Sequence, residues 1–382
     1  MSAFTRKVLL PLHLWAGLTI GLILVVVAVT GSMLVFRPQL ERRLDSQKFV
    51  VEPGLVRLAP DDLVARARAA HPTGEIESIR YYGDPTAPFL VYFSNRDYVH
   101  LNPYTGSVLG VRQRYGSLFG WAEGMHKFLL LEPTIGEPIM GYVALIFGII
   151  IFSGIVLWWP ASRRALKAGL TLNRRLKGRP WTLNLHKTFG AYAAVMLLIS
   201  VSTGVPISLD WAKDALYPLT GSKLTLPPIP PAAAKSAAFI GFNAVASSIA
   251  AVFPGAEEGY IPMPKKGLIT AYVLEAGAAH PYARSYVWLE PSAAKIIRAA
   301  PYRQAGTGYR LYYWMASLHT GQIGGPVVQF LLLCGALSIP VLAYSGTASY
   351  LRRKYGKTAA QSAKAPAATP SVTLARSGKV VS

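Results

Sequence analysis

Cysteine is almost absent from this chain of 382 residues, and its single example, Cys334, lies within an apolar run. One cysteine allows no intramolecular disulfide and no thiolate cluster, which excludes iron–sulfur centres and cysteine-ligated zinc. The sequence also lacks a glycine-rich nucleotide motif and a nucleophile elbow. It therefore gives no sign of flavin or NADPH binding, nor of Ser/His/Asp hydrolysis.

Acidic residues are few and unevenly placed. The chain has 18 Asp and Glu against 39 Lys and Arg, and every acid lies within residues 37–137 or 207–321. The N-terminus, the loop 161–184 and the tail after Tyr350 carry basic residues only. By the positive-inside rule these three segments are cytoplasmic and the two acid-containing segments lie outside. The net charge of +21 thus indicates topology, with anionic membrane lipid as its counter-ion, and not nucleic-acid binding.

Long apolar runs account for a hydrophobic fraction of 52% and a mean hydropathy of +0.33. Four of them, residues 8–36, 139–159, 189–209 and 326–350, offer the roughly 20 apolar residues that cross a bilayer. The first is too long for a signal peptide and lacks a small-x-small cleavage site, so we expect it to be retained. The sequence predicts a multi-pass protein of the bacterial inner membrane with both termini in the cytoplasm.

The two outer segments share one pattern of a helix followed by alternating, β-rich runs. In the first, a helix ends near His71 and strands follow at 76–82, 89–93, 98–101 and 108–111. In the second, a Pro-rich linker (226–231) precedes a helix ending near Phe253 and strands at 268–274 and 286–289. We therefore expect four transmembrane α-helices in two tandem repeats, each with a small periplasmic α+β domain. The predicted segments are a first span with its cytoplasmic N-terminus (1–37), a first periplasmic domain (38–117), a short helix and second span (118–160), a basic loop (161–184), a third span (185–209), a second periplasmic domain (210–308), a short helix and fourth span (309–351), and a basic, disordered tail (352–382).

Four of the seven histidines occupy matched positions in this duplication. His13 and His186 each precede a Thr-Gly pair by the same interval, 18 residues to Gly31 and to Gly204. His126 and His319 each follow a tryptophan by five residues, and they precede Ser-Gly pairs ending at Gly154 and Gly346 by 28 and 27 residues. The other three histidines, His71, His100 and His280, have no histidine counterpart, so we interpret them as ordinary residues of the outer domains.

The predicted topology places the matched histidines in two pairs at different depths. His13 and His186 share the cytoplasmic side, and His126 and His319 share the periplasmic side. Two imidazoles on opposite faces of one iron give a six-coordinate, low-spin haem b that passes electrons. Zinc is a poorer fit, because neither pair has a third ligand nearby in the sequence. The pattern predicts two haem b groups, one near each membrane surface.

Several residues near the paired histidines are candidates for supporting roles. Haem propionates need cationic partners, and the two tryptophans, Trp121 and Trp314, either flank the periplasmic haem or belong to the interfacial aromatic belt. Gly17 and Gly190, each four residues after its histidine, would let a porphyrin approach the backbone. The candidate propionate partners are Arg6, Lys7, Arg179 and Lys187 on the cytoplasmic side, and Arg112, Arg114, Lys127 and Arg310 on the periplasmic side.

Several motifs together resemble the PepSY-associated transmembrane proteins, also called iron-regulated or PiuB-like membrane proteins. They are LHLWAGL (12–18), Thr30-Gly31, LNPYTG (101–106), MHK (125–127) and SGIVLWWP (153–160). The resemblance implies PepSY domains outside the membrane and a di-haem ferric-siderophore reductase, as in the ferrioxamine-associated members of that family, with a hydroxamate siderophore as substrate. The second domain departs from the pattern, with EPSAA (290–294) in place of the Asn-Pro-x-Thr-Gly turn.

Two other functions agree with the same residues. The chain fits a haem-b electron carrier for a different periplasmic partner enzyme, and it fits a non-enzymatic PepSY protein that binds or inhibits a periplasmic partner. Tyr309, Tyr312 and Tyr313 are candidates for lining a siderophore site, although an aromatic belt explains them equally well. The electron donor is either a quinol or a cytoplasmic reductase.

Overall fold

The computed structural model describes residues 3–223 and 238–362. The predicted Pro-rich linker and the tail beyond residue 362 lie outside the described residues. Four helices are long and apolar enough to cross a membrane, which confirms the predicted spans. Several begin earlier or end later than predicted, because polar residues at their ends continue the helix. The spanning helices are α1 (Ala3–Val35), α6 (Pro133–Trp158), α8 (Gly178–Ser208) and α12 (Gly325–Ser362).

The spanning helices pack as a ring of four. Helix α8 packs against α6 and α12, and α1 packs against the same two helices. Ile20 and Leu24 of α1, Leu197 of α8 and Ile339 of α12 are buried in the shared apolar core. Helices α1 and α8 therefore occupy opposite corners of the ring, and these are the helices that carry His13 and His186.

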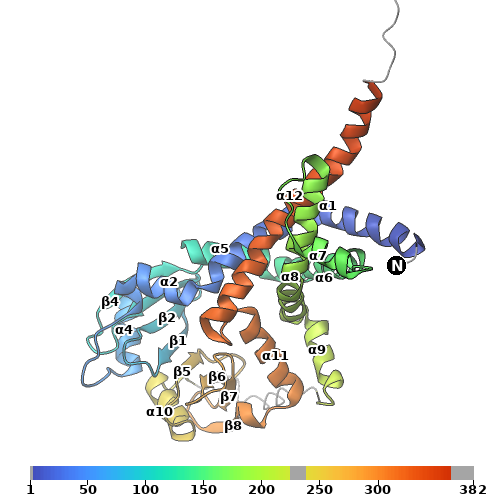
Figure 1. The fold of residues 1–382 in the computed structure, drawn as a ribbon. Coiled ribbons are helices and arrows are strands. Elements are labelled where there is room, and N and C mark those ends of the chain that lie inside the picture. The colour runs from blue at the N-terminus through green and yellow to red at the C-terminus, as the bar shows by residue number, and fades with distance from the viewer. Residues whose placement is uncertain (1–2, 224–237, 363–382) are drawn as a thin grey trace, which may run out of the picture.

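One eight-stranded antiparallel sheet lies at one end of this ring (Figure 1). Each repeat contributes four consecutive strands, so the strand order is β4-β3-β2-β1-β5-β6-β7-β8. The strands are β1 (Ile76–Tyr82), β2 (Phe89–Phe93), β3 (Asp97–Leu101), β4 (Val108–Gln113), β5 (Glu258–Pro262), β6 (Ile269–Leu274), β7 (Arg284–Leu289) and β8 (Ile296–Ala300).

The two halves of the sheet join through β1 and β5. These strands pair antiparallel, with Arg80 opposite Tyr260 near the middle of the seam. The halves also share a register shift at matched places, His100/Leu101 between β3 and β4 and Trp288/Leu289 between β7 and β8. Each repeat has the predicted α+β region, and the two regions form one continuous sheet.

Helices α4 (Pro60–Ala70) and α10 (Phe242–Val252) cover one face of the sheet. Leu63 of α4 and Ile249 of α10 are fully buried with strand residues such as Ile79 and Ile261, and each such side chain stabilises the fold by about 1.5–3 kcal/mol. Asp61 of α4 accepts hydrogen bonds from Phe242 N at 2.8 Å and from Asn243 N at 3.1 Å, which caps α10. The apolar core therefore crosses the seam and binds the halves together.

Short helices connect the sheet to the spans. Helix α5 (Leu118–Phe128) packs on α1 and α6, and α11 (Thr307–His319) packs on α8 and α9. These two helices carry His126 and His319. The remaining short elements are α2 (Arg37–Leu44), α3 (Ser46–Phe49), α7 (Arg163–Leu170), α9 (Asp210–Leu219) and the 3-10 turn η1 (Tyr302–Gln304).

Candidate functional site

Each of the four matched histidines packs against a glycine of another helix. A Cβ built on Gly154 of α6 would lie 3.0 Å from His13 Cε1, and one on Gly346 of α12 would lie 3.3 Å from His186 Cε1. The other two contacts follow the same plan: His126 Cε1 at 2.8 Å from the Cβ position of Gly31 on α1, and His319 Cε1 at 3.1 Å from that of Gly204 on α8. The sequence singled out these glycines as markers of the duplication, and the structure shows that they admit the imidazole rings.

The histidines form two pairs, which we name by their distance from the sheet. His13 and His186 are the sheet-distal pair, with ring centroids 6.0 Å apart and ring planes at 89°. His126 and His319 are the sheet-proximal pair, with centroids 6.3 Å apart and planes at 48°. The structure thus brings together the residues that the duplication paired.

Backbone carbonyls and hydroxyls orient the sheet-distal pair. His13 Nδ1 lies 3.0 Å from both Ile150 O and Ser153 Oγ. His186 Nδ1 lies 3.0 Å from Leu342 O and 3.2 Å from Ser345 Oγ. Because a carbonyl oxygen only accepts, each Nδ1 carries the proton and donates it.

The sheet-proximal pair has the same arrangement. His126 Nδ1 lies 2.9 Å from Val27 O, and His319 Nδ1 lies 3.0 Å from Thr203 Oγ1. Thr203 Oγ1 itself donates to Ile199 O at 2.6 Å, so its lone pair is left to accept from the imidazole. In all four rings the lone pair therefore lies on Nε2, which is the state that a metal ligand requires.

The spacing of each pair fits one metal ion between two imidazoles. A metal–imidazole bond of about 2 Å on either side of an ion places the ring centroids about 6 Å apart. No group of three or more His, Cys, Asp or Glu that could hold a metal ion exists among the described residues. An ion held by two imidazoles alone must bring its other ligands, as the iron of a porphyrin does. The residues present therefore fit a bis-histidine haem at both positions.

The two pairs are separated along the spanning helices. Val27, which binds His126, follows His13 by 14 residues of α1, and Thr203, which binds His319, follows His186 by 17 residues of α8. At 1.5 Å per residue these intervals correspond to about 21 and 26 Å. Both helices thus separate the two histidine pairs by most of the length of a span. The pairs therefore lie near opposite ends of the ring of four helices.

The structure leaves room beside the sheet-distal histidines. A Cβ on Gly17 would meet no atom of the described residues within 4 Å, and one on Gly190 would meet only Leu342 Cδ2 at 3.7 Å. These glycines lie one helical turn after His13 and His186. The open space agrees with the expectation that a flat group approaches the backbone there.

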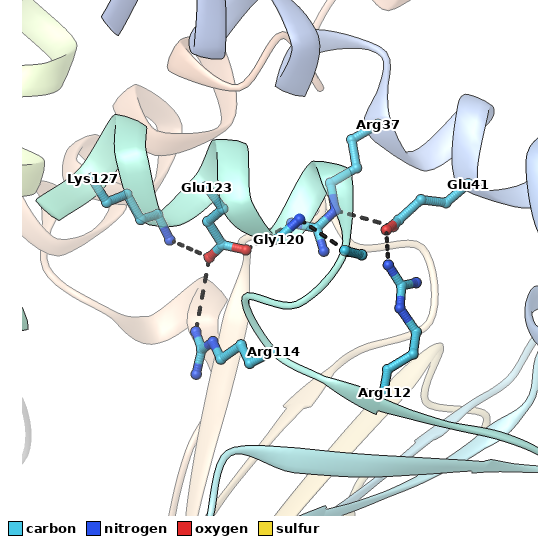
Figure 2. A network of polar contacts seen from close by, with 8 residues as sticks. Arg37, Glu41, Arg112, Arg114, Gly120, Glu123 and Lys127 are labelled. Atoms are coloured by element: carbon cyan, nitrogen blue, oxygen red, sulfur yellow. Dashed lines mark hydrogen bonds and ion pairs between the residues drawn. The ribbon is translucent and has the colours of Figure 1, made fainter. Parts of the chain in front are cut away.

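Three of the candidate propionate partners are held by carboxylates (Figure 2). Arg112 Nη2 lies 3.1 Å from Glu41 Oε1, and Lys127 Nζ and Arg114 Nη2 lie 2.9 and 3.8 Å from Glu123 Oε1. Arg37 at the start of α2 joins the groups by binding Glu41 and Glu123 at 3.0 and 2.7 Å. The charged network ties α5, and with it His126, to α2 and β4. Despite its burial, Glu123 has a pKa lowered to about 2 by Lys127 and Arg37.

The remaining candidates for supporting roles lie on the surface. Five cations are exposed: Arg6, Lys7, Arg179, Lys187 and Arg310. The side chains of Trp121 and Trp314 are 42% and 41% exposed, and Trp314 packs on His280 with ring centroids 4.8 Å apart. Propionate binding by the cations and haem contact by the tryptophans therefore remain predictions.

His280, which we interpreted as an ordinary domain residue, is the centre of a buried network of neutral groups. Its Nδ1 lies 2.7 Å from Ser317 Oγ and its Nε2 lies 2.8 Å from Tyr302 OH. Ser317 is two residues before His319, so the network ties α11 to the sheet. Burial lowers the pKa of His280. No signal in the duplication could reveal this role, because the first repeat has no matching histidine. By contrast, His100 is fully buried between Phe49 and Tyr98 in the outer domain.

The tyrosines proposed as substrate contacts lie at the junction of α11 and the sheet. Tyr309 is buried and donates to Arg284 O at 3.2 Å, while the hydroxyls of Tyr313 and Tyr286 lie 3.3 Å apart. Tyr312 stacks edge-on against Tyr313. Nearby, a cavity of about 310 Å³ lies between the loop containing His280 and the turn at Gln322 and Gly324, at the lower end of the size range of small-molecule sites.

Comparison with known proteins accounts for almost the entire chain. The PepSY-associated TM region family matches residues 10–353. No curated protein matches the chain. The family match covers all four spanning helices, both sheet halves and all four paired histidines, and the chain belongs to the PepSY-associated TM region family.

Proposed function

We propose that this protein is a di-haem b oxidoreductase of the bacterial inner membrane that carries electrons across the bilayer and reduces siderophore-bound Fe(III) in the periplasm, releasing iron. The observation that carries the proposal is the geometry of the two histidine pairs, each 6.0–6.3 Å between ring centroids. Every ring donates through Nδ1 and keeps the Nε2 lone pair. Positive-inside charge asymmetry supports a periplasmic location for the sheet.

The residues around each pair hold the imidazoles for electron transfer. A bis-histidine haem supplies a one-electron centre with no open coordination position. Ile150, Leu342 and Val27 fix three of the tautomers through their carbonyls, and Thr203 fixes the fourth. Hydrogen bonds of this kind raise ligand basicity and prevent the ring from rotating. The glycines keep the rings close to the helix backbones.

Reduction is a suitable way to release iron from a siderophore. Hydroxamate oxygens are hard ligands that favour Fe(III) strongly over Fe(II), so one added electron loosens the complex without cutting the ligand. The sheet-proximal pair lies beneath the predicted periplasmic sheet, and a haem held there would be the donor to the siderophore complex. A haem held by the sheet-distal pair would receive electrons from a quinol or a cytoplasmic reductase.

An absorption spectrum of the purified protein tests haem ligation. We expect a low-spin haem b spectrum with two haems per chain. His13→Ala or His186→Ala should remove the sheet-distal haem, and His126→Ala or His319→Ala the sheet-proximal one. The control is His71→Ala, whose imidazole lies against Phe93 and Asp97 of the sheet. A high-spin spectrum, or two haems retained in every single variant, would contradict the proposed ligands.

Anaerobic mixing tests the substrate. The protein is reduced with dithionite, freed of excess reductant and mixed with a ferric hydroxamate siderophore while the haem absorbance is followed. Reoxidation of the haems with formation of Fe(II), trapped by a ferrous chelator, is the expected result. Haems that stay reduced would instead favour an electron carrier for another partner enzyme, and a protein without haem would favour a PepSY binding or inhibitory function.

A further inference from the structure

The sheet has a second face, opposite α4 and α10, that is rich in tyrosine and arginine. Tyrosine rings on β2, β5, β6 and β7 follow one another across it. The centroids of Tyr92 and Tyr260 are 6.5 Å apart, those of Tyr260 and Tyr272 are 4.8 Å apart, and those of Tyr272 and Tyr286 are 6.3 Å apart. We call this set, together with Arg80 and Arg284, the tyrosine face.

Arg80 occupies the centre of the tyrosine face, at the seam between the repeats. Its guanidinium lies 5.6 Å from the ring centroid of Tyr92 and 5.5 Å from that of Tyr260. Nη2 donates to Tyr272 OH at 2.8 Å, and Nε lies 3.6 Å from Glu258 Oε1. The side chain of Tyr82 also contacts Arg80. A guanidinium has five donors, so these tyrosine contacts and one long ion pair leave part of its capacity unused.

Arg284 is the second cation of the face and has even fewer partners. Its guanidinium lies 4.3 Å from the ring centroid of Tyr272 and 5.3 Å from that of Tyr282. Within the described parts of the chain the guanidinium of Arg284 forms neither an ion pair nor a hydrogen bond, although the backbone carbonyl of Arg284 accepts from Tyr309. The residue is half-buried, so its charge is partly removed from water without a compensating acceptor. Such a group favours an anionic oxygen that approaches from outside.

Helices reach this face at its two ends. Phe49 of α3 packs on His100 at the β3 end, with centroids 5.2 Å apart. At the other end, Tyr313 of α11 meets Tyr286 of β7. Between them, the side chains of Arg80 and Glu258 remain 26% and 18% exposed. The centre of the face is therefore recessed but open, and it is joined through Tyr286 to α11, the helix that carries His319.

We propose that the tyrosine face binds the ferric chelate and selects complexes that carry negative charge. The inference rests on the proposed function and names the part of the molecule that holds its substrate. Arg80 and Arg284 would bind the oxygens of the chelate, and the tyrosine rings would pack against its apolar linkers. Burial keeps the pKa of Tyr272 above its ordinary value even though Arg80 and Arg284 lower it, so its hydroxyl remains a donor.

The proposed charge preference can be tested with chelates that share one iron-binding core and differ only in net charge. Ferrioxamine B carries a terminal ammonium, and acetylation or succinylation of that amine makes the complex neutral or anionic without altering the hydroxamates. The face predicts that the succinylated complex binds best and the ammonium form worst. Coulomb attraction and charge-assisted hydrogen bonds to two arginines correspond to about tenfold between the extremes.

Gallium(III) complexes of these three ligands are the probes, because gallium is not reduced and binding is measured apart from electron transfer. Affinities are determined by isothermal titration calorimetry on the full-length haem-loaded protein in nanodiscs. Arg284→Gln should weaken binding of the succinylated complex by about tenfold and abolish the charge preference. The matched control is Arg68→Gln, which removes the same charge from an exposed position on α4, beyond the opposite face. Tyr272→Phe is a second variant that keeps the ring and removes the hydroxyl.

The outcomes distinguish this inference from the function on which it rests. The inference is supported if affinity rises from the ammonium complex to the succinylated complex, and if Arg284→Gln abolishes this order while Arg68→Gln preserves it. Equal affinities for the three gallium complexes, or unchanged binding in both Arg284→Gln and Tyr272→Phe, overturn it even if ferric siderophores still oxidise the haems. Conversely, charge-selective binding of gallium complexes without haem oxidation by their ferric forms supports the site and contradicts the reductase.

Discussion

The two repeats tether their sheet-proximal histidines by different chemistry. In the first repeat, α5 is held by ion pairs of Glu123 with Arg37 and Arg114, and Lys127 of the same helix also pairs with Glu123. In the second, α11 is held by neutral hydrogen bonds of His280 with Ser317 and Tyr302. Yet both repeats keep the same histidine, the same glycine beneath it and a carbonyl or hydroxyl on Nδ1. The paired histidines and their immediate contacts are alike in the two repeats, whereas the tether to the sheet is built in two different ways.

The largest expected difference between the repeats concerns the glycines beneath the histidines. Gly31→Ala places a Cβ 2.8 Å from His126 Cε1, whereas Gly204→Ala places one 3.1 Å from His319 Cε1. The first contact is too short for any real Cβ, so the ring must move. We expect Gly31→Ala to lose most of the sheet-proximal haem and Gly204→Ala to lose less, as measured by haem content per chain. Alanine favours the helix by about 1 kcal/mol over glycine, so any loss arises from the ring contact.

The control for this comparison is Val29→Ala, an exposed position on the same helix. It should retain both haems. Equal haem content in the two glycine variants would show that the two repeats hold their rings equally tightly.

The tethers themselves should differ in strength. Glu123→Gln removes one of the two carboxylates that bind Arg37 in a half-buried site and leaves Glu41. It should destabilise α5 by about 2–3 kcal/mol, below the range for fully buried pairs, because Glu41 still pairs with Arg37 and because Lys127 and Arg114 are half-exposed. Ser317→Ala removes one neutral hydrogen bond and should destabilise α11 by about 1–2 kcal/mol. Hydrogen–deuterium exchange of each helix measures both effects. A larger effect on α11 than on α5 would reverse the comparison.

Acidification should loosen the tethers at different pH values. Glu123 has a folded pKa of about 2, below its ordinary 4.5, so its stabilisation is present above about pH 4.5 and is lost as the pH falls towards 2. His280 also has a lowered pKa in the folded protein. Because the folded state keeps this imidazole neutral, its stability decreases as the pH falls below 6.5, the ordinary pKa of histidine. On acidification of the holoprotein, α11 should gain amide exchange before α5 does. His280→Gln should remove the earlier step and leave the later one; persistence of the earlier step would assign it to another group.

Salt should have the smallest effect, and only on the first repeat. Lys127 and Arg114 are 47% and 54% exposed, so 1 M salt screens their attraction to Glu123. The loss should be about 0.5–1 kcal/mol on α5 and negligible on α11, measured by the same exchange experiment. A comparable loss on α11 would mean that charges outside the His280 network also hold that helix.

Some of this architecture could be predicted from sequence because it depends on local patterns. Apolar length predicted the spans, and alternation predicted β1 to β4 in the first repeat and β6 and β7 in the second. β5 escaped prediction because Gly259 and Pro262 interrupt its pattern, and its pairing with β1 joins residues about 180 positions apart. Gly259 is needed there because the ring of Tyr81 lies where a side chain would be.

The functional residues likewise divide into those that a pattern along the sequence predicted and those that only the fold brought together. The histidines were sorted by the duplication, since each has a counterpart at the same interval from a Ser-Gly or Thr-Gly pair. The role of those dipeptides depends on which helix crosses which, and no interval along the chain contains that information. His280 and Arg80 became visible only when the fold placed them beside Ser317 and Tyr260.

The strand pairing between β1 and β5 also constrains how the protein is made. When the first two spans have been inserted and residues 38–132 lie on one side of the membrane, β1 still presents an open edge of the kind that pairs with other chains. That edge is covered only after the third span has been inserted and residues 258–262 have followed it to the same side. Biogenesis therefore contains an interval in which the first repeat is complete in sequence but unfinished in structure. Any chaperone or insertion factor that delays the second repeat would lengthen this exposure, and a chain ending after Trp158 would never leave it.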